Sequence, residues 1–446
     1  MRTISISPDV FVPSLLSASQ EIGLCLLDSC GTQHAGSHLL IAGLFPVRSS
    51  EFSDSDVFET IDQLDQMLTG DEAAIFTLSY DLGRKLHGVG VDNTVLSSEP
   101  DVFVSLFDAL LIHDYSTGIT AITGNEERFD IIEGVFAMLP AGEPEPPDHI
   151  TRVSSNFSRD EYLSAIETIK EHIRRGNTYQ TNLTQQLTLE SSGNFPKQMI
   201  FQRIRRDHPA PFAAFLERED STVISASPER FFKTDGRQIV ASPIKGTRPR
   251  GIDRSSDDYL RNELLRSEKD RAENTMIVDL LRNDLGRVCK FGSVGVNELC
   301  ALQKLPTLFH LVSTIEGELR PDTKPSQMIE ALFPCGSITG APKLRTMQII
   351  DQLEPTRRGL SMGAIGVYIP ESGFDIPGTL DLSVAIRTMV VRDRVATFNV
   401  GGGIVIDSGP EREYEESLIK ARALLDAIGI QDLEKNSRES EHFLAV

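Results

Sequence analysis

Apolar residues recur at helical spacing in several stretches of the chain, and polar residues mark where these helices begin. Ser158 and Glu161 form a capping-box pattern, and apolar residues then follow at intervals of three and four as far as Gly176, a residue suited to end a helix. Similar spacing predicts a helix over residues 57–68 and an interrupted helix over residues 257–288. Helices are therefore expected in both halves of the chain.

The C-terminal end shows the same kind of pattern. A closing helix is predicted over residues 409–428, started by a second capping box of Ser408 and Glu411. The polar tail after it, residues 431–446, is expected to be frayed and solvated.

A Pro-rich acidic stretch, residues 139–150, is the clearest linker candidate. The chain is therefore predicted to divide into an N-terminal subdomain over residues 1–150 and a main domain over residues 151–430, with the tail beyond.

Other stretches alternate with the period of a strand. Residues 179–189 and residues 380–390 both predict strands, and the second places Leu380, Leu382 and Val384 on one apolar face, together with Ile386. Arg387 would then lie on the opposite face, where its planar guanidinium could bind a carboxylate with two hydrogen bonds. An ion pair within the protein is an equally good explanation of the residue.

One lysine stands in a segment built for unusual backbone geometry. Residues 239–241 read as a buried strand, and Pro243 and Gly246 then break regular pairing, because proline lacks a donor and glycine tolerates unusual dihedral angles. Lys245 is therefore predicted to sit on a rigid turn, where a neutral amine could act as a nucleophile. A surface lysine beside Arg248 is the alternative.

Composition excludes some classes of function. The chain has 446 residues, of which 40% are hydrophobic, so it can bury a large core. A formal net charge of −21 argues against a nucleic acid partner, because phosphates would be repelled. The five cysteines lack paired metal-ligand spacing, and no apolar run is long enough to span a bilayer or form a signal core. A reduced, cytoplasmic protein with no nucleic acid or membrane partner is expected.

Glutamates on two predicted helices could serve as metal ligands. Glu273 and Glu416 are such residues, and Glu413 and Lys420 share the face of Glu416 by spacings of three and four. Mg²⁺ prefers carboxylate oxygens together with substrate oxygens and water. Surface ion pairing is the commoner fate of helical glutamates, and spacing alone favours it.

Three further features admit a purely structural interpretation. Gly401, Gly402 and Gly403 follow an apparent strand and could bring backbone N–H groups close to an anion, or form a structural turn. His310 lies among apolar residues, as core histidines usually do. Glu229 could act as a general acid or base, or pair with its neighbour Arg230.

Seven sequence blocks in order carry a resemblance to one family. The blocks are SASPERFF (225–232), PIKGTRPR (243–250), KDRAENTMIVDLLRNDLGRV (269–288), TLFHLVSTIEGEL (307–319), FPCGSITGAPKLRTMQIID (333–351), AIRTM (385–389) and GGGIVIDS (401–408). Together they resemble the chorismate-utilising enzymes, which include anthranilate synthase component I, aminodeoxychorismate synthase component I and the isochorismate and salicylate synthases. A lysine in PIKGT, and FTLSYDLGRKL at residues 76–86, are similar to the aminodeoxychorismate branch.

The resemblance assigns roles to individual residues. It implies Lys245 as a nucleophile, Glu229 as a general acid/base and His310 as a catalytic histidine. It also implies a chorismate site formed by Gly246, Thr247, Arg387, Gly401, Gly402, Gly403 and Lys420, and Mg²⁺ ligands at Glu273, Glu416 and, less directly, Glu413. Gln180 stands where water-adding members carry a lysine base, so hydrolytic isochorismate formation is disfavoured.

The resemblance also implies an α+β fold, with β-sheets packed face to face, helices outside and two subdomains around a central cleft. The expected reaction converts chorismate and ammonia to 4-amino-4-deoxychorismate, with ammonia supplied by a separate glutamine amidotransferase subunit. Another chorismate enzyme, such as an anthranilate synthase, is the nearer alternative. A non-catalytic subunit that binds chorismate and activates a glutaminase is the more distant one.

Overall fold

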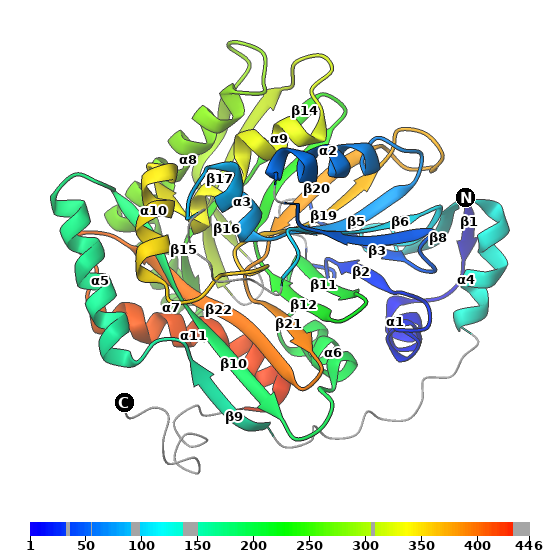
Figure 1. Cartoon of the computed structure of the whole chain (residues 1–446), viewed down its shortest axis with the longest axis horizontal. Helices are drawn as coiled ribbons and strands as arrows, with labels where there is room; N and C mark the ends of the chain where they lie inside the picture. The colour runs from blue at the N-terminus through cyan, green and yellow to red at the C-terminus, as the bar shows by residue number, and fades with distance from the viewer. Residues whose placement is uncertain (33–35, 55, 91–98, 137–149, 305–307, 431–446) are drawn as a thin grey trace.

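Two antiparallel β-sheets pack face to face, and helices cover their outer faces (Figure 1). The computed structural model describes residues 1–32, 36–54, 56–90, 99–136, 150–304 and 308–430. The predicted α+β class with face-to-face sheets and outer helices is confirmed.

The larger sheet contains twelve of the described strands, all paired antiparallel. Its order is β1 (Arg2–Ile4), β8 (Ile119–Gly124), β7 (Ala109–Asp114), β3 (Leu39–Gly43), β2 (Cys25–Asp28), β11 (Phe212–Glu217), β12 (Thr222–Ser227), β21 (Thr388–Arg392), β22 (Val395–Ile404), β10 (Gln180–Ser191) and β18 (Gly340–Ala341), with β9 (Ile150–Ser155) also paired to β10.

The smaller sheet contains ten of the described strands and is also antiparallel. Its order is β15 (Ile244–Pro249), β17 (Leu308–Glu318), β14 (Gln238–Ala241), β13 (Arg230–Asp235), β20 (Thr379–Val384), β19 (Ala364–Ile369), β5 (Ala73–Leu78), β6 (Val102–Phe107) and β4 (Arg48–Phe52), with β16 (Gly295–Lys304) also paired to β17.

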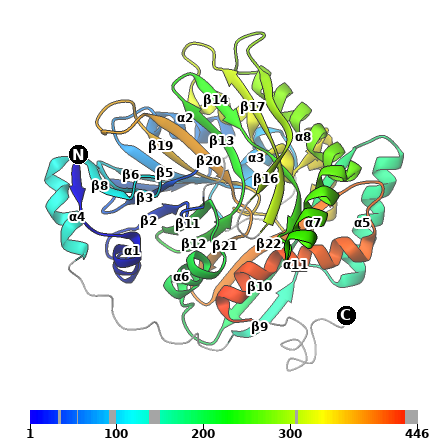
Figure 2. The ribbon, with the colours of Figure 1, turned by 180° about the vertical axis from the view of Figure 1, so that it is seen from behind.

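The helices lie outside the two sheets, as the views from both sides show (Figures 1 and 2). Those that pack on or beside the larger sheet are α1 (Pro8–Ser17), α4 (Phe129–Phe136), α5 (Arg159–Arg174), α6 (Lys197–Asp207) and α11 (Pro410–Ile428). Those on the smaller sheet are α2 (Val57–Met67), α3 (Tyr80–Leu86), α7 (Arg254–Arg266), α8 (Glu268–Gly286) and α9 (Pro325–Leu332). Helix α10 (Lys343–Leu353) lies against β10 and β18 at the end of the larger sheet. Short 3₁₀ turns cover Glu126–Arg128 and Gly336–Ile338.

Strand alternation explains how each sheet serves two cores. In β2, Cys25 is buried in the core between the sheets, whereas its neighbour Leu26 is buried against the helices of the larger sheet. In β19, Ile365 likewise enters the core between the sheets, and Ala364 enters the core under the helices of the smaller sheet. Residues buried on both faces account for the long apolar runs in these strands.

Strands from both sides of residue 150 complete each sheet. In the larger sheet, β2 from the N-terminal part pairs with β11, and in the smaller sheet β5 pairs with β19. The division of the chain at residue 150 stays a prediction. The predicted linker, except for its last residue, and the predicted tail lie outside the described residues.

The predicted helices form close to their expected bounds. The capping box of Ser158 and Glu161 is present at the start of α5, and the interruption within residues 257–288 falls at Ser267, which ends α7 and caps α8. The second capping box is wrong. The N-cap of α11 is Gly409, and the Ser408 hydroxyl instead donates to the carboxylate of Glu413 at 2.7 Å.

The single strand predicted over residues 380–390 is also wrong. The apolar face of Leu380, Leu382 and Val384 is buried as expected, but β20 ends at Val384 and β21 begins at Thr388 in the other sheet. The chain crosses between the sheets through Ala385–Arg387. Alternation continues across this crossing, so the sequence pattern alone does not reveal it.

Among the described residues, none of the helices is both long and apolar enough to cross a membrane.

Candidate active site

Lys245 lies on a strand and not on the predicted turn. Strand β15 pairs with β17, and the register shifts by one residue between Lys245 and Thr247, so Gly246 forms a bulge. Gly246 has a φ of +76°, and a Cβ there would lie 2.9 Å from side-chain atoms of Leu264 and Asp270. Glycine is therefore required both by the backbone conformation and by the close approach of helices α7 and α8.

The amine of Lys245 lies within electrostatic reach of acidic groups from three parts of the chain. Its Nζ donates to the main-chain carbonyl of Ser337 at 3.1 Å. Its charge also acts on the carboxyl groups of Glu229, Glu273 and Glu416. The fold thus brings a predicted nucleophile together with the predicted general acid and two predicted metal ligands.

Glu229 is a buried carboxyl with spare hydrogen-bonding capacity. It directly precedes β13 and is 6% exposed. Within the described residues its Oε1 has no partner. Burial raises the pKa of Glu229, although Lys245 and Ser337 oppose the shift. A carboxyl that keeps its proton to a higher pH than usual suits a general acid.

The raised pKa of Glu229 gives a stability prediction. Folded Glu229 holds a proton that the unfolded chain has lost, so the free energy of unfolding should fall as pH rises through the raised pKa. Glu229→Gln cannot titrate and removes this loss. Thermal unfolding of both proteins from about pH 4 to about pH 8 should therefore show the variant gaining stability over the wild type with rising pH. Glu219→Gln, at an exposed turn, should show no such gain, and parallel curves for Glu229→Gln would contradict the assignment.

Glu273 on α8 and Glu413 and Glu416 on α11 face one another across a lysine. The Nζ of Lys269 lies 3.9 Å from a carboxylate oxygen of Glu273 and 3.7 Å from one of Glu413. Burial raises the pKa of Glu273, with Asp270 and Glu413 adding to the shift. Burial would also raise the pKa of Glu416, but nearby ammonium groups, chiefly that of Lys420, hold it below its usual value.

This donor set fits a hard divalent cation. It consists of carboxylate oxygens from two helices, and the structure already holds a cationic group between two of them. Within the described residues, no three acidic, histidine or cysteine side chains converge on one point as a preformed metal centre. Binding of Mg²⁺ would therefore require Lys269 to move aside and the glutamates to draw together.

The three glycines lie inside a strand and not in the predicted loop. Gly401, Gly402 and Gly403 belong to β22 and pair with β10 along their whole length. A Cβ on Gly401 would strike the backbone of β10, and one on Gly403 would lie 2.2 Å from the amide nitrogen of Gln180. The run of glycines suggested a turn, but in the structure the missing side chains allow β22 to pack closely against β10 and the Gln180 side chain.

The middle glycine opens the other face of β22 toward α11. A Cβ on Gly402 would lie 3.3 Å from Glu413 Oε2 and 3.4 Å from Lys420 Nζ. Lys420 also donates to the Gly401 carbonyl and pairs with Glu416, both at 2.9 Å. Lys420 and the glycine strand are therefore brought together as the sequence predicted.

Arg387 occupies the crossing between the sheets. Its φ is +49°, in the left-handed region that is strained for arginine, so the earlier assignment to one face of a strand does not hold. Burial lowers the pKa of its guanidinium. Within the described residues, no hydrogen bond or ion pair engages that guanidinium, which leaves it available to an anionic ligand.

His310 and Thr247 meet across two strands. They are opposite each other in β17 and β15, and the Thr247 hydroxyl lies 2.9 Å from the imidazole Nδ1. The histidine is 6% exposed and is oriented by this contact.

The sequence comparisons identify the family to which this site belongs. The sequence profile of chorismate binding enzymes matches residues 28–426. This chain belongs to that family. Aminodeoxychorismate synthase component 1 of Bacillus subtilis is 37% identical over 377 residues, covering 82% of this chain and 78% of the relative. Anthranilate synthase component 1 1 of Haloarcula marismortui is 38% identical over 377 residues, covering 80% of this chain and 75% of the relative.

A solved structure of the same family has the same fold. Anthranilate synthase component I from Streptococcus pneumoniae superposes with a TM-score of 0.74 at 26% identity, covering 88% of this chain and 93% of the other. The protein is therefore a chorismate-utilising enzyme, and the two kinds of relative are about equally similar to it.

Sequence reasoning missed two residues in this candidate site. Ser337 accepts a hydrogen bond from Lys245 and opposes the raised pKa of Glu229, and Lys269 lies between the glutamates of α8 and α11. Both lie within the sequence blocks that carry the family resemblance. A serine in a short turn and a half-exposed helical lysine are common, however, so neither residue type by itself indicates a functional role.

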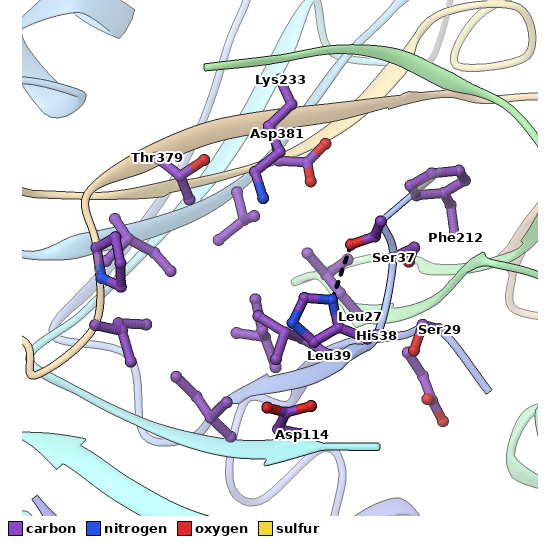
Figure 3. Close-up of a pocket in the computed structure, with 18 of the residues that line it drawn as sticks. Leu27, Ser29, Ser37, His38, Leu39, Asp114, Phe212, Lys233, Thr379 and Asp381 are labelled. Carbon is purple, nitrogen blue, oxygen red and sulfur yellow. Dashed lines mark hydrogen bonds between the residues drawn. The ribbon is translucent and has the colours of Figure 1, made fainter. Parts of the chain in front are cut away.

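The chorismate-binding enzyme also contains a cavity away from these residues (Figure 3). It has a volume of about 520 Å³ and lies between the sheets, where apolar side chains such as Leu27 and Leu39 form its walls and His38, Lys233 and Asp381 contribute polar groups. None of the predicted catalytic, substrate-binding or metal-binding residues lines it.

Proposed function

We propose that this enzyme aminates chorismate at carbon 4, producing 4-amino-4-deoxychorismate for p-aminobenzoate and folate biosynthesis. The observation that carries the proposal is the place of Lys245, whose amine lies within the field of Glu229, Glu273 and Glu416. A lysine in the PIKGT block is typical of the aminodeoxychorismate branch of the family.

In the first step, the neutral form of the Lys245 amine forms a bond from Nζ to carbon 2 of the ring while the carbon–oxygen bond at carbon 4 breaks, and the nitrogen carries the positive charge until the lysine is displaced. The departing hydroxyl takes a proton and leaves as water. Glu229 is suited to supply this proton, because burial keeps its carboxyl protonated to higher pH. His310, held by Thr247, helps to orient the leaving hydroxyl.

In the second step, ammonia forms a bond to carbon 4, and the bond between carbon 2 and Lys245 breaks. The new ammonium group then loses a proton to the site. Ammonia would come from a separate glutamine amidotransferase subunit, in keeping with the designation of the similar Bacillus protein as component 1.

The substrate anions are assigned to the cationic and glycine-lined parts of the site. Arg387 would bind a carboxylate, supported by its desolvated guanidinium, and Lys420 would bind another beside the Gly401–Gly403 strand. The Gly246–Thr247 bulge would bound the ring on the side of Lys245. Mg²⁺ held by Glu273, Glu416 and Glu413 would supply Lewis-acid stabilisation of the substrate carboxylate.

The metal assignment predicts a specific loss in one variant. Glu416→Gln keeps the size of the side chain and removes its charge, so the apparent affinity for Mg²⁺ should fall at least roughly tenfold. Direct titration with Mn²⁺, followed by its electron paramagnetic resonance signal, measures binding without relying on turnover. Glu415→Gln, at the neighbouring exposed position, should bind as the wild type does, and full activity of Glu416→Gln without added metal would exclude the role.

Product analysis tests the function. The purified chain is incubated with chorismate, Mg²⁺ and ammonium, and the product is identified by mass and chromatography. Aminodeoxychorismate supports the proposal. Anthranilate would assign the chain to the anthranilate synthases, which the similarity of the Haloarcula relative makes the second candidate. The absence of any turnover with ammonium alone would favour a non-catalytic activator of a glutaminase.

A further inference from the structure

A buried ion pair connects three segments beside the candidate active site. Arg358 and Glu354 pair through NH2 and Oε1 at 2.7 Å and through Nε and Oε2 at 2.8 Å. Their side chains are only 2% and 4% exposed. Glu354 ends α10, where its charge is unfavourable at the negative end of the helix dipole, so the guanidinium has a local reason to be there.

The remaining donors of Arg358 go to main-chain carbonyls of the site. NH1 donates to the carbonyl of Ile338 at 3.1 Å, and NH2 donates to the carbonyl of Asn182 at 2.7 Å. Asn182 is in β10, opposite Gly403 of the glycine strand. Glu354 also accepts from the backbone N–H and the hydroxyl of Thr184 in the same strand.

The carbonyl that Arg358 binds, that of Ile338, is one residue away in sequence from the carbonyl that Lys245 binds. The residue before Ile338 is Ser337, whose carbonyl accepts from Lys245 and whose side chain opposes the raised pKa of Glu229. The position of Ser337 therefore sets the direction of the Lys245 amine and the polar surroundings of the Glu229 carboxyl.

The pair is itself anchored from the N-terminal part of the chain. The Arg358 guanidinium lies 4.4 Å from the ring centroid of Tyr80 at the start of α3. The Tyr80 backbone N–H donates to the Gly359 carbonyl at 2.7 Å, and the Gly359 N–H donates to the Asp81 carboxylate at 3.0 Å. Arg358 is thus fixed in direction by the FTLSYDLGRKL segment.

We propose that Arg358 and Glu354 are positioning residues that hold the turn at Ser337–Ile338 and strand β10 in register, so that Lys245 and Glu229 face the substrate. A buried pair of this kind adds little to stability over an apolar replacement, because desolvation offsets the Coulombic attraction. Its directed contacts to two carbonyls of the site are therefore better explained by catalytic geometry than by stability. The expected effect of this pair on turnover rests on the proposed function, in which Lys245 is the nucleophile.

The chain contains a matched control for the experiment. Arg218 also forms a buried pair with a glutamate, Glu99, at 2.6 Å, and its guanidinium also lies over an aromatic ring, that of Phe103, at 5.0 Å. The Arg218 guanidinium also donates a hydrogen bond to the hydroxyl of Thr77 in β5. Arg358→Lys and Arg218→Lys both keep the charge and lose the planar fork, so a purely structural role predicts similar consequences.

The two variants are compared in turnover of chorismate with saturating ammonium. Arg358→Lys should lower kcat about tenfold with a much smaller change in the KM for chorismate, because small misplacements of reacting groups slow the chemical step. Arg218→Lys should keep the wild-type kcat even where its melting temperature falls by the same amount. Equal kinetic losses in both variants, matched to their stability, would overturn the proposal.

A second measurement does not depend on turnover. Lysines are acetylated with limiting acetic anhydride, and labelling of Lys245 is compared with that of exposed Lys324 by peptide mass spectrometry. Release of the Lys245 amine from the Ser337 carbonyl should raise this ratio about threefold or more in Arg358→Lys and leave it unchanged in Arg218→Lys. An unchanged ratio in both would overturn the positioning role, whichever product the wild type forms.

Glu354→Gln provides a milder variant should Arg358→Lys fail to fold. It keeps the Oε1 acceptor for Thr184 and for Arg358 NH2, but it removes the negative charge and the acceptor for Arg358 Nε. It should shift kcat and Lys245 labelling in the same directions by smaller factors, and wild-type values for both would contradict the proposal.

Discussion

Arg387→Met should lower kcat/KM for chorismate by about a hundredfold or more. The guanidinium is desolvated, and no partner in the described part of the chain offsets that burial. Removing one member of a buried charge pair between protein and ligand typically costs about 2–5 kcal/mol, and the hundredfold loss corresponds to about 2.7 kcal/mol. Arg387→Lys keeps a charge but loses the planar fork, so a smaller loss of at least roughly tenfold is expected.

The fold itself should tolerate this change. Methionine at position 387 inherits the same left-handed backbone strain as arginine, and it removes a desolvated charge, so thermal stability should be equal or higher. The matched control is Arg392→Met in β21, where the arginine pairs with Glu99 at 2.8 Å. That change should leave steady-state kinetics intact. Unchanged kinetics in Arg387→Met would mean that Arg387 serves the sheet crossing alone.

Elements defined by local signals were predicted well. The helix α5 begins at Ser158 because the capping box and the apolar spacing act within a few residues of one another, and the structure forms both. An interruption within residues 257–288 was also predicted, and the structure places it at Ser267. In such segments the sequence carries most of the information, because the competing states differ locally.

Elements whose limits depend on pairing with distant strands were not predicted well. The segment around Arg387 alternates as one strand would, yet its two halves pair with different sheets, and only the tertiary pairing of β20 and β21 decides where the chain crosses. The three glycines read as a loop until β10 is placed beside them. Lys245 read as a turn residue because Gly246, which forms a bulge, looks like any other turn glycine in sequence.

The same reasoning applies to the site. Residue types indicated carboxylate and amine chemistry, and the family resemblance assigned the positions, but spacing alone could not join Glu229, Glu273 and Glu416 around Lys245. Ser337 was missed because its importance comes from a carbonyl, a group that every residue carries. Contacts through the main chain leave no trace in residue type.

Lys245→Ala should abolish the covalent intermediate and lower aminodeoxychorismate formation by at least about a hundredfold. In the wild type, chorismate supplied without ammonia should leave an adduct on Lys245, which peptide mass analysis detects directly. The alanine variant should lack the adduct while its affinity for chorismate, measured by calorimetry, changes little. Arg387, the Gly401–Gly403 strand and Lys420 all remain in place. Lys304→Ala, an exposed lysine on β16, is the control and should behave as the wild type.

The product of the residual reaction separates this branch from its relatives. Once the lysine is gone, ammonia can reach carbon 2 directly, so the Lys245→Ala enzyme should turn slowly toward an anthranilate-type product. The rest of the site suits this change, because Glu229 remains buried and protonated to higher pH and can still serve the departing hydroxyl. Formation of aminodeoxychorismate at the wild-type rate by Lys245→Ala would rule out the covalent role. Lys245 would then act only through its charge on the surrounding carboxyl groups, and the loss of that charge should instead appear as a weaker affinity for the substrate.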